Sequence, residues 1–256
     1  MIEKKKINKK AQLSMFIGVA VILVVVIGLI FLIVNHSRNQ KTNISDPKIY
    51  ITNCIQESLQ KAETNITQSN LYDGGRNYAL YLGKKVPYLC LTSTYYSPCV
   101  NQEPMLIEKV RAKINNLVLA DVKNCFSILN SNLKKSGYEI SEGNLSTKIN
   151  FYDKSIELQI NKKISAKKEN ETKVYEEFSS SIQSPIFNLL KTTQKIVNYQ
   201  STYCEFNDIN WMMVYPETKI DYFITSDNTK IYTLSDRASE KNISFAVKSC
   251  SLPGGV

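Results

Sequence analysis

The stretch INFYDKSIELQI, residues 149–160, decides the class of fold. Apolar residues take alternate positions on both sides of Asp153-Lys154; they are Ile149 and Phe151 before this pair, and Ile156, Leu158 and Ile160 after it. A period of two is typical of a strand with one buried face, and a polar pair between two such runs predicts a hairpin. The chain is therefore expected to turn back on itself here as a β-hairpin.

On both sides of this hairpin the apolar residues recur every three or four positions, which predicts helices with one buried face. One helix is expected from 104 to 133, before Gly137. A second begins at Asp46-Pro47, where Asp can cap the helix and Pro can take its first position. A third starts at Ser184-Pro185 and runs towards Cys204. Helices and antiparallel strands together predict an α+β domain over 47–256.

The remaining parts of this domain are expected to be short strands and turns. A further strand is predicted at 174–178, and the stretch from Trp211 to Cys250 has room for four. Residues 70–99 contain six tyrosines, a Gly74-Gly75 pair and two prolines. This composition predicts turns and short extended pieces.

All six cysteines lie in the same domain; they are Cys54, Cys90, Cys99, Cys125, Cys204 and Cys250. An even number of cysteines in an exported domain indicates disulfides, and six cysteines allow fifteen pairings. Cys54 and Cys125 lie near the apolar faces of two different helices and form the preferred first pair. Cys90 with Cys99 would close the tyrosine-rich loop, and Cys204 with Cys250 would join a helix to the final strand.

The N-terminal part contains the only long apolar run, twenty uncharged residues from Met15 to Val34. A helix of this length spans about 30 Å, the thickness of the hydrocarbon core of a bilayer. Five lysines precede the run, whereas only Arg38 and Lys41 follow it closely, so the N-terminus is expected to be cytoplasmic. The predicted organisation is a basic leader (1–14), a transmembrane helix (15–34) in contact with membrane lipid, a tether (35–46) and an extracytoplasmic domain (47–256).

Composition and charge argue against several classes of function. The net charge is +9, but five of the basic residues belong to the leader, and arginine occurs only at 38, 76, 111 and 237. No arginine-rich stripe supports nucleic-acid binding. A mildly basic surface remains, which is compatible with acidic glycans or anionic lipids.

No motif for catalysis, cofactor binding or metal binding is found. The sole histidine, His36, follows the predicted span by two residues, and no Cys-x-x-Cys, P-loop or nucleophile-elbow motif occurs. Four carboxylates lie near predicted turns, where Asp is favoured for local reasons; they are Asp208, Asp221, Asp227 and Asp236. A hydrolase with two carboxylates would leave no local motif. A role without catalysis, cofactor or metal is nevertheless the expectation.

The sequence Lys9-Lys10-Ala11-Gln12-Leu13 resembles the processing site of archaeal class III, prepilin-like signals. The resemblance implies cleavage after Ala11, between Lys10-Ala11 and Gln12, with the apolar helix kept for assembly. Other parts of the chain resemble a group of uncharacterised single-span archaeal membrane proteins. The matching pieces are KKAQLSMFIG, Cys54-Ile55, Gly74-Gly75, Asn124-Cys125 and ITSD…IYTLSD…FAVKSC. This group has no established activity to transfer.

Two functions therefore stay open. The first is a cell-surface protein of the cell membrane with a binding or structural role, whose partner is an envelope glycan or protein. The second is a type IV pilin-like subunit that self-associates through its N-terminal helix. In the first case Tyr95 and Tyr96, near the tip of the Cys90–Cys99 loop, are the expected contact residues. In an alternative interpretation the tyrosines simply cover helix faces.

Overall fold

The computed structural model describes residues 22–24, 26, 28, 46–68, 71 and 77–252. It divides into two units, Met1–Ser45 and Asp46–Val256, and the five described residues of the first unit are helical. The rest of the predicted span, the leader with Lys10, Ala11 and Gln12, and the tether up to residue 45 lie outside the described residues. Within the described part of the chain, no helix is long and apolar enough to cross a membrane.

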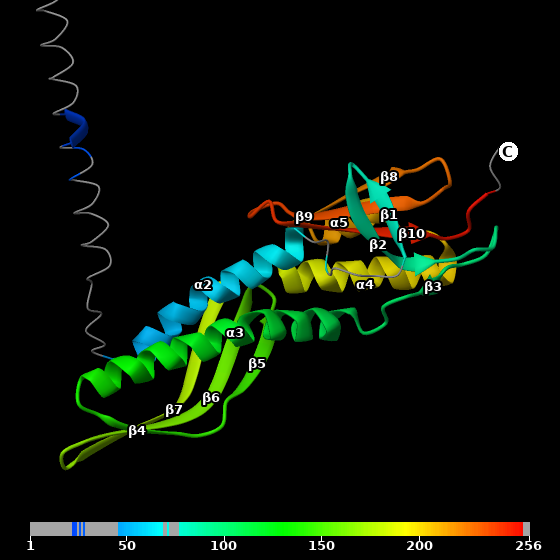
Figure 1. Ribbon diagram of the computed structural model, residues 1–256. Helices are drawn as coiled ribbons and strands as arrows, with labels where there is room; N and C mark the ends of the chain where they lie inside the picture. Colours follow the sequence, from blue (N-terminus) through cyan, green and yellow to red (C-terminus); the bar gives the residue numbers. More distant parts are fainter. Residues whose placement is uncertain are drawn as a thin grey trace, which may run out of the picture. The chain divides into compact units, whose positions relative to one another are not determined.

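In the second unit, two helices pack against a four-stranded antiparallel sheet (Figure 1). These elements are α2 (Pro47–Gln68), α3 (Leu106–Lys135), β4 (Glu139–Glu142), β5 (Ser146–Tyr152), β6 (Ser155–Lys168) and β7 (Glu171–Gln183). Strand β6 pairs with β7 on one side and with β4 and β5 on the other. Ile156, Leu158 and Ile160 are buried, whereas Gln159 and Asn161 are exposed. The predicted hairpin and its alternation are therefore confirmed.

A second, mixed sheet has six strands and packs against helix α4. Its elements are β1 (Tyr78–Tyr81), β2 (Lys84–Leu91), β3 (Val100–Asn101), α4 (Ile186–Tyr203), α5 (Asp208–Val214), β8 (Thr218–Ile224), β9 (Lys230–Asp236) and β10 (Asn242–Lys248). The strand order is β1-β2-β10-β9-β8, with β3 beside β2. The rings of Tyr81 in β1 and Phe223 in β8 lie 5.5 Å apart. Because these strands stand at opposite ends of the order, the sheet must curl until its two edges approach each other.

Local sequence sets the boundaries of the helices. At the start of α2, Asp46 Oδ1 accepts a hydrogen bond of 2.8 Å from the Lys48 backbone N–H, and Pro47 takes the first helical position. After α3, Gly137 has a φ of +87°, which a residue without a Cβ adopts readily. The backbone N–H of Tyr138 donates to the carbonyl of Leu133 at 3.1 Å. This arrangement ends the helix and directs the chain into β4.

Three disulfides join the pairs that the sequence analysis prefers. The first, Cys54–Cys125, connects α2 with α3 across 71 residues of sequence. The second, Cys90–Cys99, closes the loop between β2 and β3. The third, Cys204–Cys250, links the end of α4 to the segment after β10. Each helix of the predicted core is thus covalently tied to another element.

The prediction of an α+β, disulfide-bonded domain is confirmed, with three corrections to its strands. Strand β7 covers 171–183 rather than 174–178, because β6 offers a pairing partner along this whole length. Strands β2 and β10 are parallel, a pairing between distant segments that local patterns do not reveal. Three strands, not four, lie between Trp211 and Cys250. The first residues of that stretch belong to α5, which is capped by Asn207, whose side chain accepts a hydrogen bond from the Asn210 N–H.

Candidate functional site

The loop between β2 and β3 carries the two tyrosines predicted from the sequence. Tyr95 is 54% exposed and Tyr96 is 64% exposed, so neither ring is part of a core. Two backbone hydrogen bonds connect the loop to the C-terminal segment. Tyr96 N–H donates to the Ser251 carbonyl at 3.1 Å, and Cys250 N–H donates to the Ser97 carbonyl at 2.9 Å. Two exposed rings on a fixed loop have the geometry of a contact surface.

A larger surface lies on the open face of the four-stranded sheet, which we call the polar face. It consists of the outward side chains of three strands, all with polar groups; they are Ser146, Lys148, Asn150 and Tyr152 of β5, Ser155, Glu157, Gln159 and Asn161 of β6, and Glu177, Ser179, Ser181 and Gln183 of β7. The strand register aligns them in four rows of three. The opposite face of these strands carries the buried residues against α2 and α3.

Glu157 is the centre of a hydrogen-bond network on this face. Its Oε2 accepts hydrogen bonds from Asn150 Nδ2 at 3.2 Å, from Tyr152 OH at 3.1 Å and from Gln159 Nε2 at 3.0 Å. The hydrogen bond to Glu157 and its negative charge raise the pKa of the Tyr152 hydroxyl, so this group stays protonated and a donor. The network fixes the orientation of three polar side chains before any ligand arrives.

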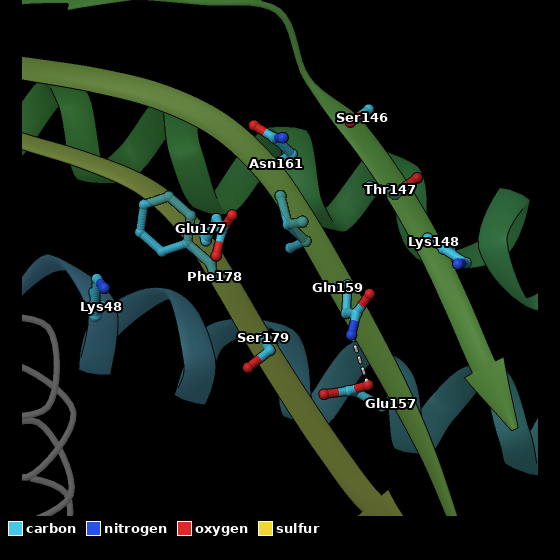
Figure 2. A pocket seen from close by; sticks show the side chains of 11 residues that line it. Lys48, Ser146, Thr147, Lys148, Glu157, Gln159, Asn161, Glu177, Phe178 and Ser179 are labelled. Atoms are coloured by element: carbon cyan, nitrogen blue, oxygen red, sulfur yellow. Dashed lines mark hydrogen bonds between the residues drawn. The ribbon is translucent and has the colours of Figure 1, made fainter. Parts of the chain in front are cut away.

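The polar face is hollowed by a groove of about 530 Å³, shown in Figure 2. Its lining comes from β5, β6 and β7, with Lys48 at the start of α2. On β6, Gln159 lies between Lys148 of β5 and Ser179 of β7 (Figure 2). Asn161 lies in the next row, between Ser146 and Glu177. Such a groove offers amide, hydroxyl, carboxylate and ammonium groups side by side. It can therefore donate hydrogen bonds to a ligand and accept them from it along its length.

A second groove, also of about 530 Å³, continues from the polar face to α2. Ser181 and Gln183 line it from β7, and Gln56 and Gln60 line it from α2. Among its other lining residues, Glu63 is only 2% exposed, and Glu63 Oε2 accepts a hydrogen bond from Lys241 Nζ. Within the described residues, Glu63 Oε1 is buried without a hydrogen-bond partner. The second groove is thus also lined mainly by polar side chains.

The four carboxylates considered for catalysis lie on different elements. Asp208 is in α5, Asp221 in β8 and Asp236 in β9, whereas Asp227 lies in the turn between β8 and β9. Partial burial alone would raise the pKa of Asp227, but hydrogen bonds from Thr225 and from Lys248 outweigh this effect and lower it to about 2. Asp227 is therefore an anion that stabilises the turn. No group of three or more His, Cys, Asp or Glu side chains in the described part of the chain could hold a metal ion.

No family model matches the chain, and neither does any curated protein or any solved structure. The activity of a relative therefore does not help to assign these surfaces. Their function has to be inferred from the chemistry of their own side chains.

The polar face was not predicted from the sequence, although the alternating pattern that indicates it is present there. The alternation in 149–160 identified the buried positions, and the residues between them, such as Asn150, Glu157 and Gln159, are the polar face itself. A strand with one buried face always presents the intervening residues on the other side. Their concentration on three adjacent strands became visible only with the register of β5, β6 and β7.

Proposed function

We propose that the chain is a membrane-anchored protein of the cell surface whose extracytoplasmic domain binds an envelope glycan without chemically changing it. The anchor is the apolar run from 15 to 34, preceded by lysines that keep the N-terminus in the cytoplasm. Three disulfides support an exported domain, since such bonds persist in oxidising compartments. The ligand-binding part is the polar face.

One observation carries the choice of a glycan: in the four paired rows of the polar face, formed by 146–152, 155–161 and 177–183, all twelve outward positions bear polar groups. A protein partner usually requires an apolar centre with large anchoring side chains. The centre of this face has none, and its one large ring, Tyr152, lies in the end row. A glycan instead presents many hydroxyl groups, each of which both donates and accepts hydrogen bonds. The amides around Glu157 offer both functions in fixed orientations.

The start of α2 favours an anchored protein over a pilin-like subunit. A pilin-like subunit would run its apolar helix into a long continuous stalk. Here α2 begins at Pro47, and Asp46 caps its first turn. A proline also disfavours helical geometry in the residue before it. We therefore treat 35–46 as a tether between two separate helices.

The anchor is tested on membranes from cells that produce the full chain. We expect the protein to stay in the membrane fraction after an alkaline carbonate wash, and its mass to include the complete leader. A mature protein that starts at Gln12 would instead support the pilin-like alternative. Release of the full chain by the wash would contradict the anchor.

Glycan binding is tested with the full chain in lipid nanodiscs on an array of neutral, acidic and amino-sugar polysaccharides. Replacing Gln159 and Asn161 together by Ala removes two amides from the groove, and each hydrogen bond is worth about 1 kcal/mol. We therefore expect binding at least tenfold weaker for Gln159→Ala/Asn161→Ala. The matched control is Asn116→Ala on the exposed side of α3, which should bind like the wild type. Equal binding by the double variant would contradict a role of the polar face.

A further inference from the structure

A second surface differs from the polar face in its chemistry, because its side chains are apolar and aromatic. It is formed by the end of α4, by α5 and by the end of β8, and we call it the aromatic surface; its exposed members are Tyr199, Tyr203, Ile209, Met213, Val214, Tyr215, Tyr222 and Ile224. Ile209, Met213 and Val214 of α5 are between 65% and 76% exposed. No residue of α5 is buried. An exposed apolar patch of this extent is typical of an interaction site.

A chain of ring contacts runs through this surface. The ring centroids of Tyr203 and Tyr199 lie 5.6 Å apart, and Tyr199 is 5.8 Å from Phe206. Phe206 is 5.8 Å from Trp211, which lies 4.3 Å from Tyr215. These distances are those of aromatic pairs in contact. The five rings therefore form one continuous chain of contacts from the end of α4 to the C-cap of α5.

Charged groups near the surface are largely balanced. Burial lowers the pKa of Lys230, while the nearby carboxylates of Glu205 and Asp208 act in the opposite direction. Asp221 forms an ion pair of 2.7 Å with Lys219. Lys195 Nζ also lies 5.0 Å from the centroid of the Tyr199 ring. Three lysines thus stand near three carboxylates, and the aromatic surface has little net charge. Its partner should be attracted by apolar contact rather than by charge.

We propose that the aromatic surface docks on the lipid headgroup region of the membrane that anchors the chain. The proposal rests on the proposed function, because it requires the anchor. Tyrosine and tryptophan combine an apolar body with a polar tip and are enriched where hydrocarbon meets water. Ile209 and Met213, one helical turn apart, would enter between the headgroups as the apolar side of an interfacial helix.

The length of the tether allows this contact. Residues 35–45 span at most about 40 Å when extended. Helix α2 has 22 residues and is therefore about 33 Å long. It reaches from the tether to β10 of the second sheet, the sheet that also contains β8. These lengths do not prevent the second sheet from reaching the membrane, and its covalent attachment makes even weak docking effective.

Trp211, the only tryptophan of the chain, reports on this docking directly. The full chain is reconstituted in phosphatidylcholine vesicles with and without brominated acyl chains, which quench the fluorescence of tryptophan close to them. We expect at least twofold quenching that stays the same between low and high salt, because the surface is nearly neutral. Ile209→Ser/Met213→Ser should abolish most of it. The control Val174→Ser, at an exposed apolar position of β7, should leave it unchanged.

The outcomes separate the docking from the anchor. A chain that resists the carbonate wash but shows unquenched Trp211 contradicts the docking and leaves the anchor intact. Unquenched fluorescence that changes with the number of chains per vesicle would assign the surface to a second copy, which also overturns the proposal. If the wash releases the chain, the anchor is contradicted, and quenching measured before the wash still decides whether the surface contacts lipid.

Discussion

Asp227 provides a test of the structure through its dependence on pH. This carboxylate accepts hydrogen bonds from Thr225, from Thr229 and, at 3.0 Å, from Lys248 Nζ. They lower its pKa from 3.8 to about 2. A shift of this size corresponds to roughly 2.4 kcal/mol at 1.36 kcal/mol for each pKa unit. The side chain is 53% exposed, so solvent screens the interaction, and we expect about 1 kcal/mol.

The sign of the effect follows from proton binding. The pKa of Asp227 is lower in the folded state than in the unfolded state, so the unfolded state binds more protons between about pH 4 and pH 2. The stabilisation is therefore complete above about pH 4 and is lost as the pH falls towards 2. Asp227→Asn removes the charge and keeps the shape of the side chain. It should lower the free energy of unfolding by about 1 kcal/mol at pH 7 and by almost nothing at pH 2.

Urea unfolding of the full chain in detergent, followed by the fluorescence of Trp211 between pH 2 and pH 7, measures this difference. Subtracting the two curves cancels the carboxylates that both proteins share. Asp153→Asn is the control, because Asp153 forms an exposed ion pair of 2.7 Å with Lys191 and should contribute less than about 0.5 kcal/mol. A difference between wild type and Asp227→Asn that is constant with pH would refute the reasoning about Asp227.

Three further predictions concern the other features. Replacing Tyr95 and Tyr96 together by Ser should change the midpoint of thermal unfolding very little, as read by circular dichroism, since both rings are exposed; a loss of several kcal/mol would place them in a core. Replacing Cys54 and Cys125 by Ala should lower the free energy of unfolding by about 4 kcal/mol, which is the chain-entropy value for a loop of 71 residues. A loss below 1 kcal/mol, measured by urea unfolding, would contradict this model. Protease added to sealed cells should degrade the chain beyond about residue 40 and spare the leader, and protection of the domain would reverse the proposed orientation.

The elements that could be predicted from the sequence are those with a repeated local signal. The apolar stripe of α3, with Val110, Ile114 and Val118 all buried, repeats over eight turns, and each repeat supports the same face. The β5–β6 hairpin repeats its alternation on both sides of one turn. Where such a signal extends over many residues, tertiary packing has little room to override it.

The elements that were missed depend on contacts between distant segments or on a short local motif. Strands β2 and β10 pair in parallel although they are far apart in the sequence. The local sequence of neither strand indicates which strand it pairs with. In α5 the residues from Trp211 to Val214 favour a strand by composition. The cap at Asn207 and the contact of the Met212 sulfur with the Ile220 N–H at 3.3 Å favour the helix instead. Such a helix is too short for periodicity to identify it.

The polar face and the aromatic surface belong to one domain, and their difference limits what each can meet. On β6, every outward position from Ser155 to Asn161 has a polar side chain, as expected for a sheet face in contact with water or with hydroxyl groups. At the end of β8, Tyr222, Phe223 and Ile224 are consecutive and each is about half exposed, so apolar groups extend on both sides of an edge strand. Proteins usually protect such an edge with charge or with a covering element. In the proposed docking, the membrane surface would cover this edge. The two surfaces are therefore compatible in one molecule, and separate experiments test glycan binding and docking.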